Sequence, residues 1–143
     1  MTDSTYLPDV NVLFAAHVTG HPHHDVALSW LRLTSRYATC GTTEHGMIRL
    51  LSNPAANPDV TTAQAMTALT ALRSRRQHTF WRDDTSLAEP LVDTTRMVGH
   101  KQVTDFHLLN LAAHYNGVLV TLDGKLERAL SPADRKHILT LQP

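Results

Sequence analysis

Several features that mark other classes of protein are scarce in this sequence. It has a single cysteine, Cys40, so it cannot form an internal disulfide, and this fits a reducing compartment. No apolar run approaches the roughly 20 residues that span a bilayer, so we expect no insertion into a membrane. The first ten residues, MTDSTYLPDV, lack the basic and apolar regions of a secretory signal. These absences together predict a cytoplasmic protein.

The sequence also lacks a net charge. Its 13 lysines and arginines balance 13 acids, beside 10 histidines. A protein that coats nucleic acid is usually basic, so neutrality argues against tight non-specific binding, although an enzyme can still handle a polyanion through a bound metal. The chain has 143 residues, 42% hydrophobic and 18% charged, which predicts one soluble globular domain over 1–143.

What the sequence does have is an alternation of strand-like and helix-like segments. Short apolar strands are expected at 6–9, 36–41, 78–81, 118–123 and 137–141. Helices are expected at 11–18, 24–33, 42–53, 62–75, 86–92 and 104–116, with Thr104 as an N-cap and Asn116-Gly117 as a stop signal. This order predicts an α/β fold, a three-layer α/β/α domain with a mostly parallel sheet. In such folds the site lies beyond the carboxyl ends of the strands.

Four acids fall where this arrangement would gather them. Asp9 follows the first strand, in LPDVNVL, and Asp123 ends the apolar segment VLVTLD. Glu44 and Asp105 lie in the first turns of helices that follow a strand or loop. Four carboxylates at one rim would repel one another, and Mg²⁺ or Mn²⁺ would relieve that repulsion and activate a water for phosphodiester cleavage. The four acids are therefore predicted to be metal ligands and catalytic groups, some of them through water.

Each acid also has an ordinary structural explanation. Asp9 could cap the next helix, Glu44 and Asp105 could favour their helix dipoles, and Asp123-Gly124 could be a simple turn. Only the combination, in this order and context, favours a metal site. The HPHH segment, with histidines at 21, 23 and 24, could suggest zinc, but without a matching cysteine or acid it favours the polar start of a helix.

The segments LPDVNVL, TTEHGMIRLLSNP and VTDFHLLNLAAHYNGVLVTLD resemble the motifs of PIN-domain ribonucleases, most closely the toxins of VapBC toxin–antitoxin systems. The resemblance covers 7 to about 139 and implies a single PIN domain. It further implies an Mg²⁺- or Mn²⁺-dependent endoribonuclease with RNA as substrate, a homodimer, and a cognate antitoxin that blocks the site.

The same resemblance implies a role for each candidate residue. Asp9 and Asp105 would be the principal metal ligands, Glu44 would bind metal or position the attacking water, and Asp123 would complete the cluster. Two polar residues, Asn11 and Thr121, would orient those ligands.

The last motif departs from the family pattern. Where many relatives have another acid and an aromatic residue, this chain has Gly124, Lys125 and Leu126. A second metal ion is therefore less expected, and Lys125 could contact an RNA phosphate. Two alternatives stay open. One is a PIN-fold module that binds RNA or protein without catalysis. The other, less favoured, is a phosphohydrolase with Asp9 as its nucleophile.

Overall fold

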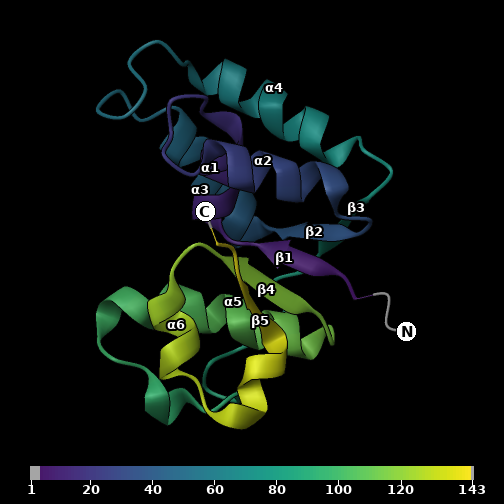
Figure 1. Cartoon of the computed structure of the whole chain (residues 1–143), viewed down its shortest axis with the longest axis vertical. Helices are drawn as coiled ribbons and strands as arrows, with labels where there is room; N and C mark the ends of the chain where they lie inside the picture. Colours follow the sequence, from purple (N-terminus) through teal and green to yellow (C-terminus); the bar gives the residue numbers. More distant parts are fainter. Residues whose placement is uncertain (1–3, 143) are drawn as a thin grey trace.

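Five parallel strands form the centre of the molecule in the computed structural model, which describes residues 4–142 (Figure 1). Their order across the sheet is β3-β2-β1-β4-β5. The strands are short: β1 (Tyr6–Pro8), β2 (Tyr37–Cys40), β3 (His78–Trp81), β4 (Val118–Thr121) and β5 (Ile138–Thr140). Because β1 and β4 are neighbours, their carboxyl ends meet at the middle of one edge of the sheet.

Helices cover both faces of this sheet, which confirms the three-layer α/β/α prediction (Figure 1). One layer holds α1 (Val10–His17), α2 (His24–Leu33), α3 (Gly41–Leu51) and α4 (Thr62–Arg73). The other holds α5 (Val103–His114) and α6 (Gly124–Ala129), with the short 3₁₀ helices η1 (Thr94–Arg96), η2 (His100–Gln102) and η3 (Pro132–His137) completing the chain. No helix among residues 4–142 is long and apolar enough to cross a bilayer.

Alternate residues of each strand feed two separate apolar cores. Leu7 of β1 and Leu119 of β4 pack in the core beneath α5, whereas Tyr37 of β2 packs in the core beneath α1–α4. Successive side chains of a strand point to opposite faces. Asp9 and Thr121 therefore lie on the α5 face, and Thr39 lies on the α1–α4 face.

The expected helix at 86–92 is wrong. Residues 82–93 form an irregular strap along α5 that contains turns but no helix. The buried Asn110 of α5 holds the strap, because its Oδ1 accepts from the Leu91 backbone N–H at 2.7 Å and its Nδ2 donates to the Ser86 carbonyl at 3.4 Å. In a helix the Leu91 N–H and the Ser86 carbonyl would bond other backbone groups; here the Asn110 side chain bonds them instead.

Helix α5 also begins earlier than expected. It starts at Val103, directly after η2, and its N-cap is Gln102, so the predicted cap at Thr104 is wrong. Its end agrees with the prediction: Asn116 takes a left-handed conformation with φ 54, and Gly117 donates to the Ala112 carbonyl at 2.7 Å. This ending turns the chain directly into β4.

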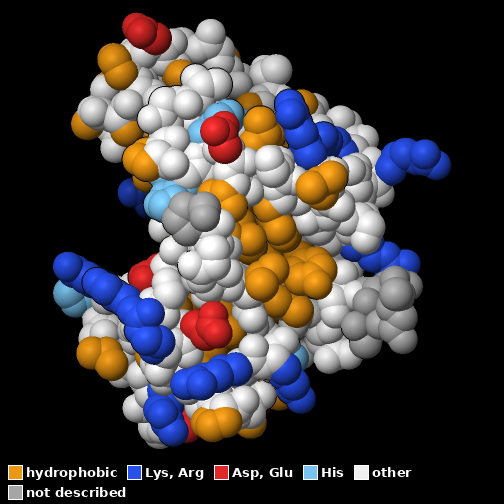
Figure 2. Space-filling model, viewed as in Figure 1, with side chains coloured by type: hydrophobic (Ala, Val, Ile, Leu, Met, Phe, Trp, Pro, Cys, Tyr) orange, Lys and Arg blue, Asp and Glu red, His pale blue; other side chains and the backbone are white. Residues whose placement is uncertain are grey.

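Basic side chains gather on one part of the surface. Figure 2 shows Lys and Arg side chains over α6 and η3, in the lower part of the molecule. Residues 124–136 supply four of them: Lys125, Arg128, Arg135 and Lys136. The same stretch has two acids, Glu127 and Asp134, so it carries a formal excess of two positive charges in a chain that has no net charge.

Candidate metal centre

Asp9 lies at the junction of β1 and α1. Its backbone N–H continues the sheet by donating to the Val120 carbonyl at 2.9 Å, and its Oδ1 caps α1 by accepting from the Val12 N–H at 2.9 Å. Only 5% of the residue is exposed. The capping explanation for Asp9 is therefore correct, but the cap uses only one of the two carboxylate oxygens.

The electrostatic environment of Asp9 is unfavourable for an ionised carboxylate. Burial raises the pKa of Asp9 to about 6, and the hydrogen bonds from Val12 and Thr121 lower it only in part. The neighbouring charge of Asp105 contributes to this raised pKa. A nearby cation would oppose both of the effects that raise it.

Asp105 and Asp123 extend this arrangement. Burial and the charge of Asp123 both raise the pKa of Asp105, which lies in the first turn of α5. Asp123 caps α6 through its Oδ1, which accepts from the Lys125 N–H at 2.9 Å, and its own N–H donates to the Thr121 hydroxyl at 3.1 Å. The three predicted aspartates thus form two repelling pairs. The charge of Asp105 acts on Asp9, and the charge of Asp123 acts on Asp105.

The fourth acid, Glu44, lies in the first turn of α3 and is engaged by other residues. Its Oε2 accepts from Arg73 Nη1 of α4 at 2.9 Å and from the Thr39 hydroxyl at 2.6 Å. Thr39 lies on the α1–α4 face, and α5, which carries Asp105, covers the opposite face. The charges of Asp9, Asp105 and Asp123 act on one another, whereas Glu44 is engaged by Arg73 and Thr39. That all four acids hold a metal stays a prediction.

Comparison with known proteins agrees with this architecture. Residues 6–130 match the PIN domain family. Two relatives come from Mycobacterium tuberculosis strain ATCC 25618 / H37Rv. Ribonuclease VapC39 is 41% identical over 131 residues, which cover 89% of this chain and 94% of the relative. Ribonuclease VapC29 is 38% identical over 123 residues, which cover 85% of this chain and 88% of the relative.

This chain belongs to the VapC family of PIN-domain proteins. It also resembles a solved structure, the crystal structure of VapBC2 from Rickettsia felis bound to a DNA fragment from their promoter. The TM-score is 0.61 and the identity 17%, with 96% of this chain and 99% of the other covered. At that identity the likeness concerns the fold alone.

Three polar residues predicted around the site of this VapC-family chain have different surroundings. Thr121 is buried and lies between Asp9 and Asp123, to both of which it is linked. Asn11 is exposed, and it is its backbone N–H, not its side chain, that forms a hydrogen bond with Asp9. Lys125 is exposed on the first turn of α6, two residues from Asp123.

Sequence reasoning missed Asp83 as a residue of this rim. Asp83 Oδ2 accepts from the Thr42 N–H at 2.8 Å, and Oδ1 lies 2.7 Å from His107 Nε2 of α5. Burial opposes ionisation, but the hydrogen bonds from Thr42 and His107 lower the pKa of Asp83 overall. The same rule that placed Asp9 could have found it, because Asp83 lies two residues beyond the carboxyl end of the parallel strand β3.

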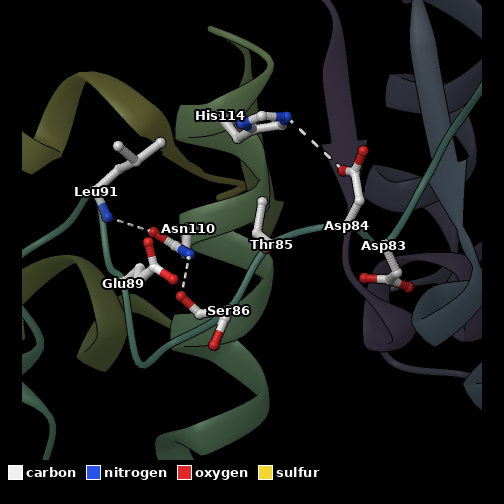
Figure 3. A pocket seen from close by; sticks show the side chains of 8 residues that line it. All are labelled: Asp83, Asp84, Thr85, Ser86, Glu89, Leu91, Asn110 and His114. Atoms are coloured by element: carbon white, nitrogen blue, oxygen red, sulfur yellow. Dashed lines mark hydrogen bonds and ion pairs between the residues drawn. The ribbon is translucent and has the colours of Figure 1, made fainter.

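A pocket of about 370 Å³ lies between the strap and α5 (Figure 3). Its lining consists of Asp83, Asp84, Thr85, Ser86, Glu89, Leu91, Asn110 and His114. Several of these groups serve the strap itself: Asn110 bonds Leu91 and Ser86, and His114 Nε2 lies 3.7 Å from Asp84 Oδ1. None of the aspartates of the candidate metal centre lines it.

The donor set of the three aspartates fits Mg²⁺ or Mn²⁺, provided that water completes the coordination. Within residues 4–142, no three His, Cys, Asp or Glu side chains are placed to hold one ion together. Mg²⁺ is usually held by one or two protein carboxylates and keeps several waters. Asp9 and Asp105 are two such carboxylates with hard oxygen donors, and Asp123 is available through a water.

The histidines of the α1–α2 turn are engaged with the backbone. His21 Nδ1 accepts from the His23 N–H at 3.0 Å, and His24 Nδ1 lies 2.8 Å from the Ala15 carbonyl. These contacts hold the turn at the start of α2, in line with the polar helix start that the sequence favoured.

Proposed function

We propose that this VapC-family chain is a metal-dependent endoribonuclease that hydrolyses RNA phosphodiester bonds with a metal-activated water. The observation that carries the proposal is the buried Asp9, whose pKa is raised to about 6 beside Asp105. A carboxylate in that position is costly unless a cation joins it. The ribonuclease names of the Mycobacterium tuberculosis relatives support the same activity.

In this proposal Asp9 and Asp105 hold the ion, and Asp123 holds one of its waters. A bound Mg²⁺ lowers the pKa of a water and neutralises charge that develops on the phosphate. The chain orients the ligands through fixed contacts: the Val12 N–H fixes one oxygen of Asp9, and Thr121 connects Asp9 with Asp123. The burial of Asp9 excludes bulk water from its side of the site.

We do not assign an ion-binding role to Glu44. Both of its oxygens lie within 3.2 Å of Arg73 Nη1, so its charge is already balanced. We propose instead that Glu44 stabilises the packing of α3 against α4 through its ion pair with Arg73.

We infer that the chain acts as the toxin of a toxin–antitoxin pair, in the cytoplasm and as a homodimer. Membership of the VapC family supports the antitoxin partner, and the VapBC2 structure from Rickettsia felis is a related complex. Expression of the chain alone is expected to arrest growth, and expression with its antitoxin is expected to restore it.

The deciding experiment compares the wild type with Asp9→Asn. Asparagine caps a helix as well as aspartate does, so α1 should persist in the variant. We expect the variant to bind Mn²⁺ at least tenfold more weakly in calorimetry and to lose RNA cleavage by a factor of about 100 or more. Asp25→Asn, at an exposed position of α2, is the matched control and should retain both.

Full cleavage by a folded Asp9→Asn variant would contradict the nuclease. RNA binding without cleavage by the wild type would instead support the non-catalytic module. A phosphorylated intermediate trapped at Asp9 would support the phosphohydrolase.

A further inference from the structure

A second pocket, of about 260 Å³, lies between α6, η3 and β5, and the candidate metal centre does not use it. It is lined by Gly124, Glu127, Arg128, Arg135, Thr140 and Gln142. It belongs to the part of the surface where Figure 2 shows basic side chains over α6 and η3. The pocket therefore combines two guanidinium groups with a hydroxyl and an amide.

Neither guanidinium is neutralised by an acid of the described chain. Arg128 and Arg135 form no ion pair with any acid of residues 4–142, in contrast to Arg73, which is paired with Glu44. The acid nearest in the lining, Glu127, accepts from the Thr140 hydroxyl at 2.7 Å.

A second acid in this region, Asp134, is directed inward. It is 8% exposed, and its Oδ2 accepts from the Asp93 N–H at 2.8 Å. Glu127 keeps its charge in the lining, so the two guanidinium groups leave the pocket with a formal excess of one positive charge, which favours an anion from solution.

The pocket adjoins Asp123 because of a glycine. A Cβ on Gly124 would lie 3.1 Å from Nη1 of Arg128, so the missing side chain leaves room for the guanidinium against the turn that carries Asp123. Gly124 is also the position where the last motif departs from its family pattern. Arg128 Nη1 therefore lies close to the turn that carries Asp123.

We propose that Arg128 and Arg135 form a phosphate-binding subsite for the RNA strand, next to the phosphate that is cut. This inference rests on the proposed ribonuclease function. Arginine binds phosphate oxygens with two parallel N–H donors, and the Gln142 side chain in the lining adds a further polar group. The volume of about 260 Å³ is sufficient for a phosphate, and two guanidinium groups favour a charged phosphate over an uncharged base.

A carboxylate of a protein partner is the competing occupant, and the position favours RNA. A strand whose phosphate lies at Asp9 and Asp123 continues past Gly124, the next residue of the chain, and meets Arg128. Because the whole chain has no net charge, a local excess of arginine is one of the features that could attract RNA.

The test measures binding of a fluorescent single-stranded RNA by anisotropy, without divalent ions, over a series of salt concentrations. The variants are Arg128→Gln and Arg135→Gln, and the matched control is Arg32→Gln on an exposed position of α2. Each lost phosphate contact should lower the slope of log K against log salt by about 0.7. We expect binding at low salt to weaken about tenfold in each pocket variant and to stay unchanged in the control.

Cleavage assays with Mn²⁺ separate this subsite from the metal centre. The pocket variants should raise KM by a similar factor and leave kcat within about twofold, since the arginines hold a phosphate that does not react. Arg128→Lys should keep the salt slope, because the charge remains, but recover only part of the affinity, because the paired donors are lost.

Unchanged KM and salt slope in both pocket variants would overturn the subsite. So would variants that bind RNA normally but lose affinity for the antitoxin, since the occupant would then be a protein carboxylate. Failure of the proposed function has a different signature, which is a wild type that cuts no RNA with Mn²⁺ whatever the variants do.

Discussion

The position of Asp9 exposes its carboxyl group to opposing electrostatic effects. As the cap of α1 it donates nothing and accepts the Val12 N–H, which favours its ionised form. Its burial and the charge of Asp105 favour the protonated form, and they prevail, since the pKa is raised to about 6. In the absence of metal, the ionised residue is therefore a source of instability in the folded chain.

We predict that Asp9→Asn stabilises the metal-free protein at pH 8. The folded-state pKa lies above the usual 3.8, so the stability associated with protonated Asp9 is present at low pH and is lost as the pH rises through about 6. A difference of two pKa units corresponds to about 3 kcal/mol. Urea unfolding in EDTA should show a gain approaching this value at pH 8 and a smaller gain at pH 5.

The control for this prediction is again Asp25→Asn, which lies on an exposed position of α2 and should leave the pH dependence unchanged. If Asp9→Asn is less stable than the wild type at pH 8, the electrostatic account of Asp9 is wrong.

Glu44 and Asp105 permit a direct comparison of two predicted ligands. Because Arg73 and Thr39 already engage Glu44, we predict that Glu44→Gln changes Mn²⁺ affinity less than threefold. The variant should lose about 1 kcal/mol of stability, since Arg73 is 43% exposed and its pairing is weakened by solvent. Asp105→Asn should weaken Mn²⁺ binding at least tenfold. If calorimetry shows that Glu44→Gln and Asp105→Asn lose Mn²⁺ affinity equally, Glu44 is a metal ligand after all.

At the scale of elements, much of the arrangement could be predicted from the sequence because it follows from strand order. Asp9 and Asp123 follow parallel strands that prove to be neighbours, and the α5 residue Asp105 faces them. What could not be predicted depends on contacts between distant residues. The face chosen by Glu44 depends on Arg73, 29 positions away, and the strap at 82–93 depends on Asn110, 19 positions from Leu91.

The junction of α5 and β4 is the element-scale feature most sensitive to substitution. A Cβ at Gly117 would lie 2.6 Å from the Thr5 carbonyl and 2.6 Å from the Trp81 ring, neither of which is the end of a flexible side chain. We predict that Gly117→Ala destabilises the fold by about 1–3 kcal/mol in urea unfolding. Gly20→Ala is the matched control, since a Cβ there meets nothing within 4 Å. Equal stability of the two variants would contradict the packing at this junction.

At the scale of the whole molecule, the candidate centre connects the two helical layers. Asp9 begins α1 on one side of the sheet, and Asp105 and Asp123 begin α5 and α6 on the other (Figure 1). An ion held by these acids would stabilise the packing of α1 on one face of the sheet and of α5 and α6 on the other. Binding should therefore be visible in the stability of the entire fold.

We predict that Mn²⁺ raises the melting temperature at pH 8 and has much less effect at pH 5. Near pH 5 Asp9, whose pKa is raised to about 6, is largely protonated, so the ion must displace a proton and its affinity falls. At an ion concentration about 100 times Kd, binding adds about 2.7 kcal/mol. For a chain of this size, that corresponds to roughly 8–10 °C in a calorimetric melt. A shift of equal size at both pH values, or one retained by Asp105→Asn, would place the ion elsewhere in the protein.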